Sequence, residues 1–248
     1  MRLNGKTAIV TGGASGFGAG IVQKFLTEGA RVMIADINAE AATKLAETCG
    51  SNCIAQAVDV ANATSVNAMA QAAIAAFGHV DILINNAGVT YLPTPLDEVS
   101  EDDFDRVFNV NMKSVYLTAR ALVPHMKSRQ SGAILNVAST AGVSPRPNLN
   151  WYNASKGWMI TATKTMAVEL APQGIRVNAI NPVAGETPLL KSFMGEDTPE
   201  IRAKFISTIP MGRFSTPEDM GNAACYLCSD EASMVTGIAM EVDGGRCI

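Results

Sequence analysis

The 248-residue sequence predicts an α/β protein in which helices cover both faces of a parallel sheet. Short apolar runs rich in β-branched residues alternate with longer, Ala-rich stretches of helical periodicity. Both faces of those runs are apolar, as expected for strands buried in a parallel sheet. Because no linker rich in Pro, Gly or Ser divides the chain, we expect one domain that spans residues 1–248.

The expected elements follow one another in a regular order, joined by right-handed crossovers. Strands are expected at residues 7–10, 31–34, 53–55, 82–84, 133–137 and 176–180. Helices are expected near residues 16–28, 39–48, 64–77, 101–128 and 151–171, and a further helix and strand close the chain. Asn38, Asn62 and Ser100 directly precede three of these helices, and their side chains are of the types that accept hydrogen bonds from the first helical amides.

Residues 187–212 match no core element. Apolar side chains such as Leu189 and Phe193 are mixed there with Gly195, Pro199 and Pro210. Insertions of this length are usually lids or disordered loops. The apolar content favours a lid that folds over a binding site.

The composition excludes several classes of protein. Lys and Arg number 19 against 23 Asp and Glu, so there is no basic field to bind nucleic acid or an anionic membrane. No apolar run reaches the roughly 18 residues of a spanning helix, and residues 1–6 turn polar too early for a signal peptide. We therefore expect a cytoplasmic protein that binds neither nucleic acid nor membrane.

Histidine and cysteine are too few for metal or disulfide chemistry. His79 and His125 are the two histidines, which leaves no His-rich metal site, and we expect no metal. Five cysteines in a reducing compartment argue against a disulfide framework. Cys225 and Cys228 have the spacing of a redox or zinc motif, but they are interpreted more simply as small apolar residues that pack a helix.

A glycine-rich loop at residues 11–18 follows the first strand and opens the first helix. Its glycines allow a tight turn and a close approach to a pyrophosphate, which the free amides at the helix N-terminus would bind. Asp36 ends the second strand, where a carboxylate binds ribose hydroxyls; the alternative is a helix-capping or loop carboxylate. Because Asp36 would repel the extra phosphate of NADP and Ile37 adds no positive charge, the sequence predicts NAD.

A second set of polar residues predicts the site of chemistry. Tyr152 and Lys156 are four residues apart, so they share one face of a helix, although an exposed helix pair has the same spacing. Ser139 ends a buried strand, and residues 85–88 (Asn-Asn-Ala-Gly) close another. In open α/β sheets, ligands bind at the carboxyl ends of such strands.

Together these motifs resemble the short-chain dehydrogenase/reductase family over the full length of the chain. The matching residues are 11–18, Asp59, 85–88, Asn111, Ser139, Tyr152, Lys156, Asn181, Pro182, Thr187 and 243–245. The resemblance implies a seven-stranded, Rossmann-type, doubly wound parallel sheet. It also implies an NAD-dependent oxidoreductase that acts on a small-molecule alcohol or ketone.

The resemblance also implies roles for individual residues. Asn111 would hold a water molecule in a proton relay, Lys156 would bind the nicotinamide ribose, and Asp59 and Val60 would flank the adenine. The expected catalytic residues are Asn111, Ser139, Tyr152 and Lys156. The expected cofactor contacts are Gly12, Ser15, Gly16, Phe17, Gly18, Asp36, Ile37, Asp59, Val60, Asn86, Ala87, Gly88, Tyr152, Lys156, Val183 and Thr187.

The expected chemistry is reversible oxidation of a secondary alcohol to a ketone. A free tyrosine has a pKa near 10, and the Lys156 ammonium and a cationic nicotinamide would both favour the phenolate. Tyr152 would then act as general acid and base while hydride moves to or from the nicotinamide. Ser139 would hydrogen-bond the same substrate oxygen.

One position departs from the family pattern. The family usually has glycine after the proline of Asn181-Pro182, whereas this chain has Val183, with Gly185 two places later. We expect the glycine's flexibility to have moved along the loop, which leaves Thr187 as partner of the nicotinamide carboxamide. The alternative is a site that holds the cofactor weakly.

The substrate is less well defined by the sequence. The expected pocket wall consists of Thr140, Ala141, Tyr91, Trp151 and residues 187–194, with Leu189 among them. Arg146, Asn148 and Asn150 would suit a polyol, sugar or hydroxy acid, or they form a solvated loop or subunit contact. Apolar residues 189–194 would equally suit a hydrophobic cyclic alcohol. Acyl-carrier-protein ketoreduction is disfavoured by Asp36 and by the lack of a basic docking patch.

The resemblance implies a homotetramer, in which helices near 101–128 and 151–171 pair across a dimer and the C-terminal strand completes the assembly. Trp158 suits the dimer contact, or is ordinary core, and Cys247 would be buried in the assembly. Two rival functions remain. One is a regulator that senses NAD without turnover, and the other is a serine hydrolase, although no G-x-S-x-G elbow is present.

Overall fold

Seven parallel strands form one sheet in the computed structural model, which describes residues 1–248. The strand order is β3-β2-β1-β4-β5-β6-β7, so the direction of winding reverses between β1 and β4. Ligands bind beyond the carboxyl ends of the strands at such a reversal. The doubly wound, Rossmann-type sheet is thereby confirmed. The strands are β1 (Thr7–Thr11), β2 (Arg31–Asp36), β3 (Cys53–Ala57), β4 (Ile82–Asn85), β5 (Gly132–Val137), β6 (Ile175–Pro182) and β7 (Ala239–Val242).

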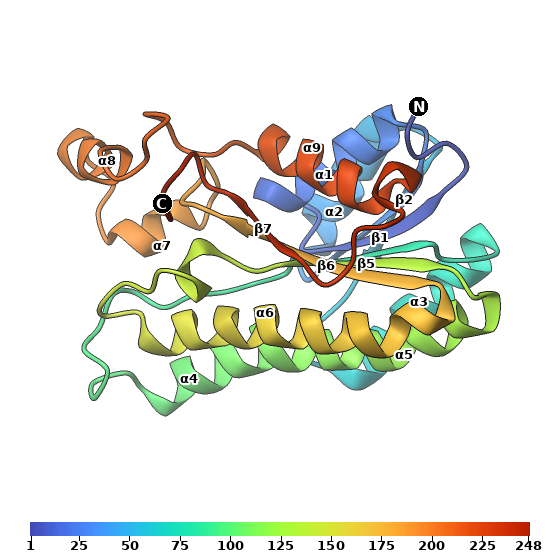
Figure 1. The fold of residues 1–248 in the computed structure, drawn as a ribbon, viewed down its shortest axis with the longest axis horizontal. Helices are drawn as coiled ribbons and strands as arrows, with labels where there is room; N and C mark the ends of the chain where they lie inside the picture. The colour runs from blue at the N-terminus through green and yellow to red at the C-terminus, as the bar shows by residue number, and fades with distance from the viewer.

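Helices cover both faces of the sheet, as Figure 1 shows. On one face lie α1 (Gly16–Thr27), α2 (Ala39–Cys49) and α9 (Pro217–Cys228). On the other lie α3 (Ala63–Phe77), α4 (Glu101–Val107), α5 (Ser114–Arg129) and α6 (Asn150–Leu170). Each face has its own apolar core, because alternate side chains of the central strands point to opposite sides. Ile34 packs toward α1 and α9, for example, whereas Met33 packs toward α3.

The predicted helix starts agree with the structure. Asn38 accepts a hydrogen bond from the amide of Ala41, and Asn62 accepts one from the amide of Ser65, both at 3.0 Å. Ser100 likewise caps α4. The single helix expected over residues 101–128 is instead α4 and α5 joined by a π-helical turn (Phe108–Lys113). Such turns are frequent at functional sites.

The last strand, β7, could not be located by its own sequence pattern. It has four residues, Ala-Met-Glu-Val, and most of its side chains are only partly covered. It is an edge strand, paired on one side with β6. A short edge strand needs no continuous apolar run, so the pattern that marks the central strands is absent.

Residues 187–212 contain two short helices, α7 (Leu190–Met194) and α8 (Pro199–Ile206), where the sequence predicted no regular element. Figure 1 shows them apart from the two helical layers, next to the C-terminus. Leu190, Met194 and Ile209 form a small apolar cluster with Val183 and Phe214. The segment is therefore packed by its own side chains and is not a disordered loop.

Cys225 and Cys228 of α9 are buried in the core between α1 and the sheet. Burial raises the pKa of the Cys228 thiol to about 12, which disfavours the reactive thiolate. This agrees with the interpretation of these residues as packing residues. No His, Cys, Asp and Glu side chains gather in threes to form a metal site. None of the helices combines the length and apolar character that crossing a membrane requires.

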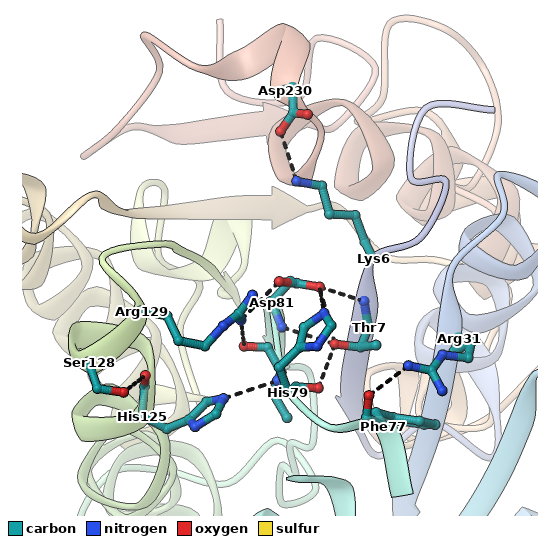
Figure 2. A network of polar contacts seen from close by, with 11 residues as sticks. Lys6, Thr7, Arg31, Phe77, His79, Asp81, His125, Ser128, Arg129 and Asp230 are labelled. Carbon is teal, nitrogen blue, oxygen red and sulfur yellow. Dashed lines mark hydrogen bonds and ion pairs between the residues drawn. The ribbon is translucent and has the colours of Figure 1, made fainter.

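A polar network joins β1, β4 and α5 at the amino ends of the strands (Figure 2). The Asp81 carboxylate accepts hydrogen bonds from the amide of Thr7 at 2.9 Å and from Arg129 at 3.0 Å. His79 lies 3.2 Å from the same carboxylate, and His125 accepts a hydrogen bond from the amide of Val80. Burial raises the pKa of Asp81, but the bonds from Thr7 and Arg129 outweigh this and hold it below the ordinary value.

We expect Asp81→Ala to lower the free energy of unfolding by about 2–4 kcal/mol at neutral pH, since it leaves Arg129 without its carboxylate. Because the pKa of Asp81 is lower in the folded state, its contribution is complete above the unfolded-state pKa of about 4 and disappears as the pH falls through the folded value. Urea unfolding at pH 7 and at low pH measures both effects. Glu231→Gln, in the exposed pair with Arg2, is the control and should change unfolding little. Equal losses in both variants would contradict the role of Asp81.

Candidate active site

One cavity of about 470 Å³ lies at the carboxyl ends of the strands, within the size range of small-molecule sites. Its wall runs from the ends of β2 and β3, past the glycine loop after β1, to the ends of β5 and β6 and the segment 187–212. Of the expected catalytic and substrate residues, Ser139, Tyr152, Lys156, Thr140, Ala141 and Leu189 line it. The expected cofactor contacts also line it, except Gly18.

Gly18 does not line the cavity and packs against the loop itself, so its expected contact with the cofactor stays a prediction. A Cβ atom there would lie 2.6 Å from Nδ2 of Asn86, so Gly18 permits close packing inside the loop. That Asn86 amide donates to the carbonyls of Thr11 and Gly12, both at 2.9 Å. Gly12 has φ of +60°, and a Cβ atom there would lie 2.9 Å from Cα of Ala87. The loop is thus held against β4, and the first amides of α1 stay free for a pyrophosphate.

Asp36 has a structural role in the loop, and its position also leaves it available for the expected ribose contact. Its carboxylate oxygens accept hydrogen bonds from the amides of Ala14 and Asn38, both at 3.0 Å, so it shapes the loop. It also lines the cavity, and each oxygen keeps a lone pair for a ribose hydroxyl. Ile37 beside it is 77% exposed, and Asp59 lines the same end. No Lys or Arg lines this end, so its charge is negative.

Tyr152 and Lys156 lie one turn apart on α6, and both are buried. The Lys156 ammonium is 5.8 Å from the centre of the Tyr152 ring and donates a hydrogen bond to the carbonyl of Val137 at 2.9 Å. Ser139 follows β5, and its hydroxyl accepts a hydrogen bond from the amide of Ala141 at 3.0 Å. Helix α6 and the end of strand β5 therefore bring a phenol, an ammonium and a hydroxyl to one part of the cavity.

Burial favours the neutral forms of Tyr152 and Lys156. It raises the pKa of Tyr152 to about 12, and a hydrogen bond with Ser139 and the charge of Arg146 oppose the rise only in part. It lowers the pKa of Lys156 to about 8. Tyr152 is therefore a neutral phenol at neutral pH, and the expected action of Lys156 and a cationic nicotinamide in favouring the phenolate stays a prediction.

Asn111 does not line the cavity, and its expected role in a proton relay stays a prediction. It is fully buried in the π-helical turn, where its side-chain oxygen accepts from the amide of Val89 at 2.9 Å. Its amide donates to the carbonyl of Val89 at 2.9 Å and to Ser155 at 3.0 Å. Gly88 lies between Asn111 and Lys156. A Cβ atom on Gly88 would be 3.4 Å from the Lys156 ammonium and 3.5 Å from the Asn111 oxygen. Asn111 thus supports the wall behind Lys156.

Tyr91 also lies outside the cavity wall. It is buried against Tyr152, and its hydroxyl accepts a hydrogen bond from the amide of Trp151 at 3.0 Å. Trp151 itself packs edge-on against Phe104, 5.4 Å between ring centres. These residues anchor the first turn of α6 and do not line the cavity. The sequence could not separate them from wall residues, because a buried aromatic ring and a pocket aromatic ring have the same pattern.

The three polar residues of the loop before α6 that were considered for substrate binding differ in their positions. Asn148 and Asn150 are exposed and match the solvated-loop interpretation. Arg146 instead lines the cavity. Its backbone carbonyl accepts a hydrogen bond from the Asn153 side chain at 2.7 Å, which ties the loop to α6.

Gly185 does not supply flexibility, contrary to the expectation. Its φ lies outside the left-handed region that only glycine adopts readily. A Cβ atom there would lie 2.6 Å from Cε1 of Phe17 and 2.7 Å from Oγ of Ser215, so its small size is what the fold requires. The side chain of Val183 is mostly buried in the apolar cluster under α7 and α8. Valine at this position therefore connects β6 to the segment 187–212.

Thr187 lies at the glycine loop, as expected for a cofactor contact. Its amide donates to the carbonyl of Gly185 at 2.8 Å, and its side chain packs on Gly16, the first residue of α1.

Sequence reasoning missed several cavity residues. Phe205, Thr208 and Ile209 come from the segment 187–212, and Arg246 comes from the tail after β7. The tail is folded by Asp243, whose carboxylate accepts from the amides of Gly245 and Cys247 at 2.9 and 2.8 Å. The Asp-Gly-Gly sequence at 243–245 predicts a turn, but only the fold shows that the turn directs Arg246 toward the cavity.

The serine hydrolase alternative is wrong. Both histidines lie in the Asp81 network at the amino ends of the strands, whereas Ser139 is at a carboxyl end. No histidine lines the cavity. Ser139 therefore has no imidazole base.

Comparison with known proteins agrees with this geometry. A family model described as enoyl-(acyl carrier protein) reductase matches residues 12–246. A 4-formylbenzenesulfonate dehydrogenase of Comamonas testosteroni is 48% identical over 252 residues, covering 100% of both chains. A 3-ketoacyl-(acyl-carrier-protein) reductase of Brucella melitensis in complex with NADH is also 48% identical, with a TM-score of 0.95 over 99% of this chain and 100% of that one. An NAD⁺-bound xylitol dehydrogenase is 29% identical, with a TM-score of 0.92 over 99% and 100%.

The fold and the cavity define a nucleotide-binding oxidoreductase of the Rossmann type. With these matches, the chain belongs to the short-chain dehydrogenase/reductase family.

Proposed function

We propose that the protein is an NAD(H)-dependent oxidoreductase that interconverts a secondary alcohol and its ketone. The observation that carries this proposal is the single cavity that joins Asp36 at one end to Ser139, Tyr152 and Lys156 at the other. A dinucleotide laid along it would bind its adenosine ribose at Asp36, its pyrophosphate at the N-terminus of α1 and its nicotinamide ribose at Lys156. The alternative, an NAD sensor without turnover, gives no reason for Ser139 and Tyr152 to meet in this cavity.

The preference for NAD is supported by the charge at the Asp36 end. The positive side chains that line the cavity are Arg146, Lys156 and Arg246, none of which belongs to the glycine loop or to the ends of β2 and β3. A 2′-phosphate would meet the Asp36 carboxylate without a compensating cation. The NADH and NAD⁺ in the two similar solved structures agree with this preference.

The nicotinamide supplies the hydride acceptor or donor when it is bound. In reduction, the neutral Tyr152 phenol donates its proton to the substrate oxygen, and Ser139 stabilises the charge that develops there. In oxidation, Tyr152 must first lose its proton in order to accept one from the alcohol. Lys156 would bind the nicotinamide ribose, and its charge beside Tyr152 would favour that loss.

The raised pKa of Tyr152 predicts a pH dependence. Because the phenol is protonated at neutral pH, oxidation should become faster as the pH rises from 7 toward 10, while reduction should not need high pH. Measuring kcat/KM in both directions in a series of buffers over this pH range tests the assignment of Tyr152 as the general acid and base. A rate of oxidation that falls as the pH rises would contradict it.

The proposal also gives the segment 187–212 the role of a lid and includes a homotetrameric assembly. Phe193, Phe205 and Ile209 line the cavity from α7, α8 and the residues that follow, so the segment would act as the lid over the substrate.

Phe108, Tyr116 and Trp158 are exposed on the π-helical turn, α5 and α6, which supports pairing of these helices in a homotetramer. We also propose that the protein is cytoplasmic.

Reduction of a 3-ketoacyl thioester is a second candidate, favoured by the name of the 48% identical NADH complex. Acetoacetyl-coenzyme A with NADH or NADPH distinguishes it from small alcohols.

The decisive experiment is a screen of NAD reduction across sugars, polyols, hydroxy acids, cyclic alcohols and aryl alcohols, with NAD binding measured separately by calorimetry. Turnover of any secondary alcohol supports the proposal. A flat trace with every alcohol, alongside tight NAD binding, would favour the sensor instead.

A further inference from the structure

Arg146 is a positive side chain inside the cavity that has no acidic partner. It is half-buried, and its guanidinium forms no ion pair and donates no hydrogen bond to the protein. Arg202 within the segment 187–212 is paired with Asp197, and Arg213 directly after it is paired with Asp219. A guanidinium shielded from water usually has a carboxylate or similar partner, because unpaired burial of charge is costly.

Two aromatic rings of the lid cover the guanidinium. Its central carbon lies 5.0 Å from the ring centre of Phe205 and 5.9 Å from that of Phe193. Such contacts fix the plane of the group and leave its N–H edge available for an acceptor. Phe193 also packs edge-on against Tyr152, 5.2 Å between ring centres. One aromatic ring therefore separates the phenol from the guanidinium.

The charge of the whole cavity is divided along its length. Its carboxylates, Asp36 and Asp59, lie at the ends of β2 and β3. Arg146 and Arg246 lie at the opposite end with Lys156, and Arg246 is close enough to lower the pKa of Arg146 further, beyond the effect of burial. An anion at that end would meet two guanidinium groups and no protein carboxylate.

We propose that Arg146, assisted by Arg246, binds an anionic group, a carboxylate or a sulfonate, at the end of the substrate remote from the reacting carbon. The body of this substrate is apolar and flat enough to pack between Phe193 and the aliphatic wall formed by Val183, Leu189 and Ile209. Arg146 is thereby a specificity-determining residue: it selects anionic alcohols and ketones over neutral ones. This inference rests on the proposed function, because it takes Tyr152 as the site of the reacting oxygen.

A purely structural role for Arg146 makes a different prediction. If the guanidinium only latches α7 and α8 through Phe193 and Phe205, its loss disturbs the lid for every substrate alike. If it binds the substrate, its loss affects anionic substrates more than neutral ones. The comparison of two substrates that differ only in charge separates the two roles. Any change in the Tyr152 pKa on removal of Arg146 acts on both substrates and cancels in their ratio.

The test uses the full-length protein with 4-(1-hydroxyethyl)benzoate and its neutral amide, 4-(1-hydroxyethyl)benzamide. Both turnover and binding to the NAD-saturated protein are measured, the latter by calorimetry. We expect the wild type to prefer the benzoate by about 10- to 100-fold in kcat/KM and in affinity, the range for a hydrogen bond between charged groups. Arg146→Met, which keeps the apolar stem, should abolish the preference for the benzoate over the amide. Arg146→Lys should retain part of it.

Arg120→Met on the exposed face of α5 is the matched control and should leave the preference intact. Equal losses for benzoate and amide in Arg146→Met, or no preference in the wild type, would overturn the anion site. If neither compound is turned over but the benzoate still binds more tightly through Arg146, the anion site stands and the proposed reaction fails. If Arg146→Met does not fold, the preference is compared between wild type, Arg146→Lys and Arg246→Met, and an unchanged ratio in both variants overturns the proposal.

Discussion

Replacement of Tyr152 by phenylalanine should lower kcat by about 10²- to 10⁴-fold, the usual contribution of a positioned general acid or base. The variant removes one oxygen atom and keeps the ring that packs against Phe193. Since the phenolic oxygen is the group that exchanges a proton with the substrate, both directions of the reaction should be affected equally. NAD affinity should change by no more than about twofold. Steady-state rates in both directions and calorimetric titration with NAD measure these effects.

Tyr91→Phe is the matched control for this prediction. Tyr91 is buried in the same aromatic cluster, but its hydroxyl accepts a hydrogen bond from the backbone of Trp151 and does not line the cavity. Its removal should cost about 1 kcal/mol of stability and change kcat only slightly. Retained turnover in Tyr152→Phe, or equal loss in the two variants, would remove Tyr152 from the chemistry.

Replacement of Asp36 should have the second large effect. In Asp36→Ala the ratio of kcat/KM for NAD to that for NADP should fall by about 100-fold, because the ribose hydroxyls lose an acceptor and the 2′-phosphate no longer meets a negative charge. Adding Ile37→Arg should lower the ratio further, since the exposed position 37 can direct a cation toward the phosphate. Initial rates with both cofactors at a fixed substrate concentration provide the measurement.

Asp36 also accepts hydrogen bonds from Ala14 and Asn38, so Asp36→Ala disturbs the glycine loop as well. Asp36→Asn keeps one acceptor oxygen and removes the charge, and it should lower the ratio with less loss of NAD affinity. Asp59→Asn at the same end is the control for a general change in charge. An unchanged ratio in both Asp36 variants would contradict the ribose role of this residue.

The fold could be predicted almost completely from the sequence because its signals are local. Central strands such as β1 and β4 are buried on both faces, and this requires uninterrupted apolar runs that are visible in the chain. Asn38, Asn62 and Ser100 act on amides three residues away, so their caps depend on neighbours in the sequence. The edge strand β7 was expected but could not be located, and the short helices α7 and α8 were missed, because their stability depends on packing with distant residues.

The site could be predicted in outline for the same reason. The glycine loop, Asp36, Ser139, Tyr152 and Lys156 follow or lie within elements whose positions the sequence reveals, and the parallel sheet brings the ends of those elements together. What the sequence could not show is which of the expected residues line the cavity. Asn111, Tyr91 and Gly18 lie behind its wall and support it.

The amino-acid sequence by itself determined the order of the elements, the acidic end of the cavity and the pairing of Tyr152 with Lys156. These depend on residue type and on spacings within single elements. Only the tertiary structure decided that Arg146 lies near enough to lower the pKa of the Tyr152 phenol, and that Arg246 lines the same end of the cavity. Electrostatic interactions depend on separation in space and on burial, and both quantities arise when segments distant in the chain are packed together.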